Sequence, residues 1–124
     1  MGKKVLISRK AIDRRVKELA DKISSDYRGK EPILVGILKG SIFFYADLAR
    51  EMKIPVKLDF IRAFSYGAET HSSGSVQFTK DVELPVEGRD IIIVEDIVDT
   101  GLTLTKIRET LMDKGASSFR ICAL

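Results

Sequence analysis

The sequence predicts an α/β fold, a mainly parallel twisted sheet flanked by helices, with one antiparallel lid arm. The segments 32–38 and 91–94 are apolar at nearly every position, which is typical of strands buried on both faces of a parallel sheet. Helical segments lie between the strands, and strand, helix and strand within about thirty residues form a right-handed βαβ unit. The length of 124 residues predicts a single domain over 1–124.

The boundaries of the elements are well marked along the chain. Apolar residues recur three and four positions apart in the helical segments, whereas the strands are continuous or alternating apolar runs. Glycine, proline and small polar residues separate them. In order, the sequence predicts a helix from an N-cap at Ser8 to about Gly29, a strand over 32–38, a helix over 41–52, a strand over 56–62, a mobile loop over 65–74, an antiparallel strand over 75–81, a strand over 91–94, a helix over 102–114 and a strand over 119–124.

The composition excludes several classes of function. Hydrophobic residues make up 44% and charged residues 31% of the chain, as in soluble globular proteins. The net charge of +3 includes no basic stripe, so we expect no nucleic-acid partner. No stretch is apolar enough for a membrane span or a signal peptide, so we expect a cytoplasmic protein without a membrane partner. The single cysteine, Cys122, lies in an apolar run and is expected to be a buried, unreactive thiol.

The strongest functional pattern joins a buried strand to the start of a helix. Ligands of open α/β sheets bind beyond the carboxyl ends of such strands. Backbone N–H groups and hydroxyls at the helix start suit a phosphate, whereas two adjacent acids suit sugar hydroxyls or a hydrated magnesium ion. Three acids, two threonines and a glycine occupy this junction: Glu95, Asp96, Asp99, Thr100, Thr103 and Gly101.

A purely structural interpretation of this junction stays open for single residues. Asp99 or Thr100 alone would be an ordinary helix cap, and the other acids could be solvated. The whole set after such an apolar strand favours a site for a ribose 5-phosphate. A Walker phosphate loop is excluded because no Gly-Lys-Ser/Thr follows the glycine, and the dinucleotide fingerprint is absent as well.

Three motifs carry a resemblance to a known family. The segment 95–103 resembles the phosphoribosyl pyrophosphate signature of the type I phosphoribosyltransferases and is most similar to the hypoxanthine-guanine branch. The segment 38–41, Leu-Lys-Gly-Ser, resembles the pyrophosphate loop of that family, and Ser65-Tyr66 resembles the Ser-Tyr pair on its lid. The motifs occur in the family's order, and the similarity covers essentially the entire chain.

The resemblance implies a purine-salvage enzyme that transfers the 5-phosphoribosyl group from phosphoribosyl pyrophosphate to hypoxanthine or guanine and releases pyrophosphate. The transition state would resemble an oxocarbenium ion. In this family Asp99 would be the catalytic proton acceptor facing N7 of the purine. The family also has a cis peptide bond in the pyrophosphate loop, which here would join Leu38 and Lys39.

The resemblance also assigns binding roles. Glu95 and Asp96 would hold the ribose hydroxyls and a magnesium ion, the expected cofactor. The other expected substrate-binding residues are Lys39 and Gly40 at the pyrophosphate, Ser65 and Tyr66 closing over it, and Thr100, Gly101, Leu102 and Thr103 at the 5-phosphate. The aromatic residues Phe43, Phe44 and Tyr45 are expected in the core rather than at a ligand.

The sequence departs from the family at its end. Beyond a strand like 119–124, family members supply a lysine that reads the purine oxygen, a stacking aromatic residue and a final acid. None is present here, so the chain is expected to be truncated or completed by a second polypeptide. A homo-oligomer, either a dimer or a tetramer, is also expected. The alternatives are an RNA-binding transcriptional attenuator with the same fold, and an incomplete fragment that binds only the sugar phosphate.

Overall fold

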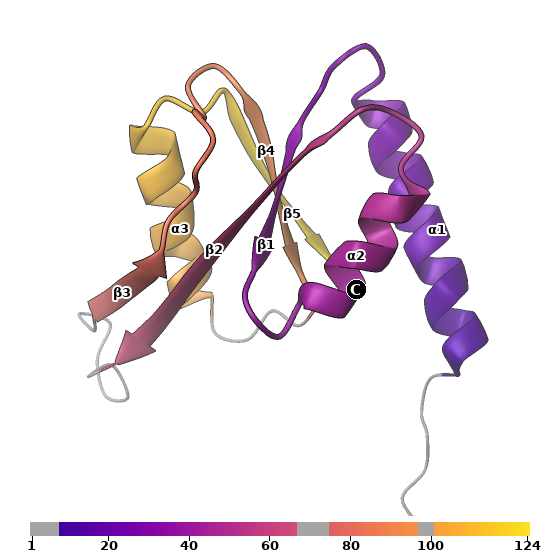
Figure 1. Cartoon of the computed structure of the whole chain (residues 1–124), viewed down its shortest axis with the longest axis horizontal. Helices are drawn as coiled ribbons and strands as arrows, with labels where there is room; N and C mark the ends of the chain where they lie inside the picture. The colour runs from indigo at the N-terminus through magenta and orange to yellow at the C-terminus, as the bar shows by residue number, and fades with distance from the viewer. Residues whose placement is uncertain (1–7, 67–74, 97–100) are drawn as a thin grey trace, which may run out of the picture.

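The structure, a computed structural model, describes residues 8–66, 75–96 and 101–124. These residues form a five-stranded sheet with the strand order β3-β2-β1-β4-β5, and helices cover both of its faces (Figure 1). No helix in these three ranges is both long and apolar enough to cross a membrane. The elements are α1 (Arg9–Asp26), β1 (Ile33–Ile37), α2 (Ile42–Glu51), β2 (Lys57–Tyr66), β3 (Ser75–Lys80), β4 (Asp90–Glu95), α3 (Leu102–Asp113) and β5 (Ser118–Ala123).

The predicted fold class is confirmed. Strands β2, β1, β4 and β5 run parallel, and β3 pairs with β2 in the antiparallel sense, as expected for the arm. All five residues of β1 are buried, which explains its continuous apolar sequence. The N-cap prediction is also confirmed, because the Ser8 hydroxyl accepts a hydrogen bond from Ala11 N.

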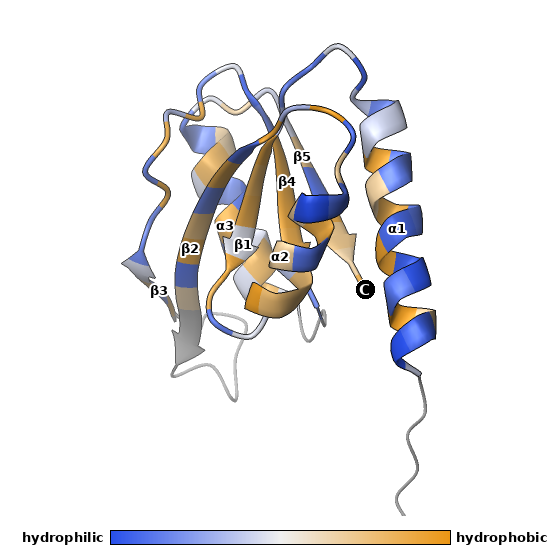
Figure 2. Cartoon of the chain, turned by 45° about the vertical axis from the view of Figure 1, so that its right-hand side comes forward, coloured by the Kyte–Doolittle hydropathy of each residue, from blue (hydrophilic) through white to orange (hydrophobic). Residues whose placement is uncertain are grey.

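The core is divided between the two faces of the sheet. On one face α1 and α2 pack on alternate residues of β1 and β4, such as Leu34 and Ile92. On the other face α3 packs on the intervening residues, such as Val35 and Ile93. Figure 2 shows the apolar stripe of α1 turned toward the sheet and its polar side turned outward. Both apolar faces of the sheet are therefore covered over most of their area.

Two boundaries differ by more than one residue from those predicted. Strand β2 continues to Tyr66, so the backbone of Ser65 and Tyr66 belongs to the arm rather than to the loop. The cause is pairing with β3, which places Ser65 opposite Val76 and Tyr66 opposite Ser75. Helix α1 ends at Asp26, and the expected end near Gly29 falls in the following turn.

The aromatic residues of α2 divide between core and surface. Phe44 and Tyr45 are buried as predicted, but Phe43 is 81% exposed, so its placement in the core was wrong. Successive helix residues are rotated by about 100°, so three in a row cannot all face the sheet. Cys122 is buried as predicted, and burial raises the pKa of its thiol, which keeps it protonated and unreactive.

Candidate functional site

The carboxyl ends of three neighbouring parallel strands form one edge of the sheet. Gly36 of β1 lies opposite Val94 of β4, so these two strands end together one residue later, at Ile37 and Glu95. On the other side of β1, Ile37 lies opposite Ile61, and β2 continues five residues farther to Tyr66. The loop after β1 and the end of β4 with its acids therefore lie side by side, next to the projecting arm (Figure 1).

The loop between β1 and α2 is fixed at both ends. The buried Ser41 hydroxyl donates to Ile37 O at 2.6 Å and accepts from Ile37 N at 3.1 Å. Leu38 N donates to Ile61 O of the neighbouring strand at 2.9 Å. Lys39 and Gly40 remain exposed between these anchors, and the peptide bond between Leu38 and Lys39 is cis, as the family resemblance predicted.

The exposed part of this loop presents donors to an anion. Within the three described ranges, the backbone N–H groups of Lys39 and Gly40 have no acceptor, whereas Ser41 N already donates to Ile37 O at 3.4 Å. Among the described residues the space beside Gly40 is open, since a Cβ built there would meet none of their atoms within 4 Å. Two amides and one ammonium group are thus available at the end of β1.

Two partly buried carboxyl groups lie at the end of β4. Asp96 N donates to Glu95 Oε1 at 3.2 Å. Burial and the neighbouring Asp96 carboxylate raise the pKa of Glu95 to about 7. A carboxyl group in such surroundings gains stability from a proton or from a cation. Because the described residues hold no cluster of three or more histidines, cysteines or acids, a metal ion here would take its other oxygens from substrate and water.

Helix α3 begins at the same edge. Gly101 precedes it with φ at 87°, in the left-handed region that residues with a side chain adopt only under strain. The Thr105 hydroxyl donates back to Gly101 O at 2.9 Å, which closes the first turn. Leu104 is 8% exposed and anchors that turn in the core. The positive end of the helix dipole therefore faces the edge, where it favours an anion.

The structure brings most of the predicted site residues to this one edge. Two of the predicted residues, Asp99 and Thr100, lie outside the described residues, and for Ser65 and Tyr66 only the backbone is described. The residues at the edge are Lys39, Gly40, Glu95, Asp96, Gly101, Leu102 and Thr103, together with the backbone of Ser65 and Tyr66.

Sequence reasoning missed two supporting side chains. Ser41 was predicted only as the last residue of the pyrophosphate-loop motif, yet its hydroxyl closes the base of the loop. Asp59 lies within a strand, where an acid on an apolar face is a signal of a specific polar contact. That signal was present in the sequence and was not used.

Comparisons with known proteins agree with this geometry. Residues 6–124 match the family model described as phosphoribosyl transferase domain. Hypoxanthine-guanine phosphoribosyltransferase of Streptococcus agalactiae serotype V is 45% identical over 122 residues, which are 98% of this chain and 68% of that protein. The Mycobacterium tuberculosis H37Rv protein of the same name is 40% identical over an alignment of 128 residues, which covers 98% of this chain and 63% of that protein.

Solved structures show similarity to the same group of enzymes. A hypoxanthine-guanine phosphoribosyltransferase from Bacillus anthracis superposes with a TM-score of 0.92 at 40% identity, covering 98% of this chain and 72% of that one. A hypoxanthine phosphoribosyltransferase from Staphylococcus aureus gives a TM-score of 0.92 at 39% identity, covering 98% and 66%. None of these four proteins bears the name of an RNA-binding regulator. Because the family model covers residues 6–124, nearly the whole chain, the chain belongs to the phosphoribosyl transferase domain family.

Proposed function

We propose that this protein acts in purine salvage and transfers the 5-phosphoribosyl group from phosphoribosyl pyrophosphate to hypoxanthine or guanine, releasing pyrophosphate. The observation that carries the proposal is the common end of β1 and β4, which leaves the Lys39 loop beside Glu95 and Asp96. Hydrogen-bond donors for an anion lie there beside carboxylates that can hold sugar hydroxyls or a cation. Phosphoribosyl pyrophosphate requires both kinds of group.

Lys39 and the backbone amides of Lys39 and Gly40 are the proposed pyrophosphate subsite. As the bond at the anomeric carbon breaks, negative charge grows on the departing pyrophosphate. Fixed donors aimed at that charge stabilise the transition state more than the ground state. The anchoring of Ser41 to Ile37 supports this role, because it holds the loop in place before the substrate binds.

Glu95 and Asp96 are the proposed ligands of the ribose hydroxyls and of magnesium. The donor set fits this ion, since it consists of two carboxylates and Mg²⁺ usually keeps several waters and substrate oxygens. When bound, the ion would neutralise pyrophosphate oxygens. The raised pKa of Glu95 supports the assignment, because a cation would relieve the cost of holding its charge beside Asp96.

The start of α3 is the proposed subsite for the 5-phosphate. Gly101, Leu102 and Thr103 lie at the positive end of the helix, and Thr100 precedes them. Binding energy from this remote group would position the anomeric carbon for reaction. Asp99 is the proposed proton acceptor at N7 of the purine, and this role rests on the family resemblance.

The remaining parts of the proposal concern the arm and the assembly. Ser65 and Tyr66 would close over the pyrophosphate and exclude water. Their position on β2, beyond the end of β1, supports this role. We also propose a single domain, a homo-oligomer and a cytoplasmic location. A second polypeptide is not part of the proposal, since none of the relatives described above is named with one.

Product formation tests the proposed reaction. The protein is incubated with phosphoribosyl pyrophosphate, Mg²⁺ and either hypoxanthine or guanine, and the nucleotide is measured by chromatography. The same assay is run on the chain fused to a C-terminal segment of the Streptococcus agalactiae relative. We expect nucleotide from at least one form and a large loss with Asp99→Asn. Absence of product from both forms, with both folded, would overturn the proposal.

A further inference from the structure

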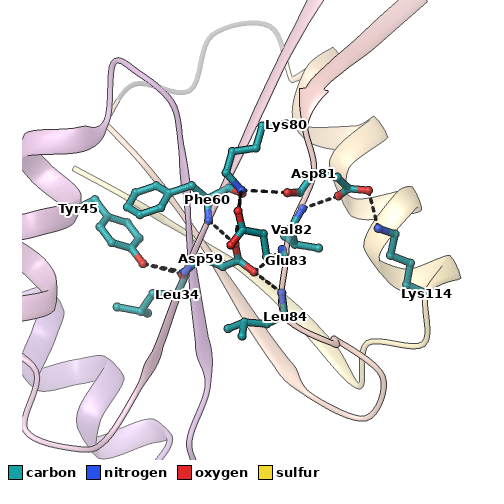
Figure 3. Close-up of polar contacts among 10 residues, drawn as sticks. All are labelled: Leu34, Tyr45, Asp59, Phe60, Lys80, Asp81, Val82, Glu83, Leu84 and Lys114. Carbon is teal, nitrogen blue, oxygen red and sulfur yellow. Dashed lines mark hydrogen bonds and ion pairs between the residues drawn. The ribbon is translucent and has the colours of Figure 1, made fainter.

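A buried carboxylate on β2 is not explained by the proposed site. Asp59 is 5% exposed and lies on the face of the sheet that packs against α3, where its neighbours within the strands, Val35 and Ile61, are apolar. An isolated charge in such a place is strongly unfavourable, so its partners matter. Figure 3 shows Asp59 between Leu34 and Tyr45 on one side and the segment Val82–Leu84 on the other.

Three backbone amides satisfy this carboxylate. Its Oδ1 accepts from Phe60 N at 2.8 Å, and its Oδ2 accepts from both Glu83 N and Leu84 N at 2.8 Å. The Tyr45 hydroxyl accepts from Asp59 N at 3.3 Å and donates to Leu34 O at 2.8 Å, which fixes the backbone of this strand to β1. Asp59 is thus a rigid acceptor for the segment that follows β3.

The topology explains why that segment needs acceptors. Strand β3 is at one edge of the sheet, so the chain must cross over β2 and β1 before it enters β4. Val82, Leu84 and Val86 of this crossing pack against the apolar cluster beneath α3. Partly buried amides outside regular structure must still be paired. Asp59 supplies that pairing at the point where the arm returns to the body of the protein.

Lys80 completes the attachment at the end of β3. Its Nζ lies 3.9 Å from Asp59 Oδ1 and 3.1 Å from Glu83 Oε2. The same ammonium donates to Phe60 O at 3.3 Å and to Asp81 O at 3.1 Å. One side chain therefore ties the returning strand of the arm to β2 and to the crossing.

The pairing of the arm changes immediately beyond this attachment. Arg62 lies opposite Lys80 but Ala63 lies opposite Phe78, so Thr79 is an extra residue at this point. The Thr79 hydroxyl lies 3.2 Å from Arg62 Nη1 and 3.4 Å from Arg62 O. The arm thus has a root at Asp59 and Lys80, a bulge, and a distal part, 63–66 with 75–78, that extends beyond β1.

We propose that Asp59 is a positioning residue that fixes the root of the arm and thereby holds the distal part over the pyrophosphate subsite. The inference rests on the proposed function in one respect, namely that pyrophosphate binds beside the arm. The attachment itself stands on the contacts of Asp59 alone. Two measurements test the attachment of the arm and the binding of pyrophosphate beside it separately.

Hydrogen exchange of the whole chain tests the attachment. In Asp59→Asn the amide NH₂ group must face either Phe60 N and Lys80 Nζ or the amides of Glu83 and Leu84, so at least one contact is lost. We expect faster exchange in 60–66 and 75–84, with unchanged protection in β1 and β4. Unchanged exchange in the arm and the crossing would overturn the proposal.

Two further variants accompany this test: a matched control, and a substitute in case Asp59→Asn does not fold. Asp81→Asn removes the same charge from an exposed neighbour that pairs with Lys114 and accepts a hydrogen bond from Val82 N at 2.7 Å. The Asn side-chain oxygen can keep the Val82 contact, so this variant is the matched control and should leave the arm unchanged. If Asp59→Asn does not fold, Lys80→Gln removes only the ammonium contacts and should loosen 75–84 to a smaller extent. Exchange in Lys80→Gln equal to that of the unaltered chain would then contradict the proposal.

Ligand titrations test the consequence for the site. We expect Asp59→Asn to weaken binding of magnesium pyrophosphate by about three- to thirtyfold and to leave binding of ribose 5-phosphate unchanged, because the latter lies by α3. Equal weakening of both ligands would indicate general destabilisation and overturn the positioning role. If the unaltered chain binds neither ligand, the proposed function fails, whereas the exchange experiment still decides whether Asp59 fixes the arm.

Discussion

Gly36 of β1 lies directly opposite Val94 of β4, and this pairing sets where the two strands end. The two strands end one residue later, at Ile37 and Glu95. The loop that contains Lys39 follows β1, and the carboxyl groups of Glu95 and Asp96 lie at the end of β4. A shift of the register by two residues would separate the loop and the acids by about 6 to 7 Å along the strands. The register of β1 against β4 is therefore part of the site.

The absence of a side chain at Gly36 is required by its neighbours. A Cβ there would lie 2.6 Å from Tyr45 Cδ2 and 3.0 Å from Phe60 Cδ1, and these two rings pack at 4.5 Å between centroids. We expect Gly36→Ala to lower the free energy of unfolding by about 1–3 kcal/mol, since the rings must move. Urea unfolding followed by circular dichroism measures it, and a loss below the error of the method would contradict the account.

Gly40→Ala is the matched variant with the opposite expectation. Nothing lies within 4 Å of a Cβ at this position, so the stability should stay within about 0.5 kcal/mol of the unaltered chain. The added methyl group would occupy the open space in which pyrophosphate is proposed to approach the loop. Calorimetric titration with magnesium pyrophosphate should show weaker binding, and unchanged affinity would remove Gly40 from the subsite.

Gly101 is required for its backbone conformation rather than for space. Its φ of 87° is strained for a residue with a Cβ, although no atom of the described part of the chain lies within 4 Å of that Cβ position. We expect Gly101→Ala to cost about 1 kcal/mol of stability, and Gly101→Asn to cost less because asparagine tolerates this region better. Thermal unfolding of both variants provides the comparison. Equal stability of Gly101→Ala and the unaltered chain would contradict the left-handed conformation.

The pKa of Glu95 predicts a pH dependence of stability without metal. The folded pKa of about 7 lies above the ordinary glutamate value of 4.5, so between these values the folded state binds more protons than the unfolded state. The contribution of Glu95 to stability therefore falls as pH rises from about 4.5 to 7. Glu95→Gln should gain stability relative to the unaltered chain across this window. A constant difference between the two proteins from pH 5 to 8 would contradict the shift.

The sequence was sufficient to predict the strands that are buried on both faces of the sheet. Strands β1 and β4 are buried on both faces, and their continuous apolar runs predict them directly. The acids and the glycine that follow β4 predicted the edge at which the site lies. These features depend on local sequence and on the rule that ligands bind beyond parallel strands.

Other features depend on contacts between distant segments. The length of β2 is set by its pairing with β3, so the local sequence around Ser65 and Tyr66 looks like a loop. The role of Asp59 depends on amides 24 and 25 residues farther along the chain. No local pattern encodes such a contact, although an acid within a strand already indicates that a partner must exist.

Binding of phosphoribosyl pyrophosphate tests the central claim most directly. The chain is titrated with this ligand by calorimetry, with and without Mg²⁺, and the double variant Glu95→Gln with Asp96→Asn is titrated in parallel. The account predicts one saturable site that requires Mg²⁺ and is weakened at least about tenfold in the double variant, since two charged ligands are lost. A folded chain that shows no saturable binding, or binds equally well without these carboxylates, would contradict it.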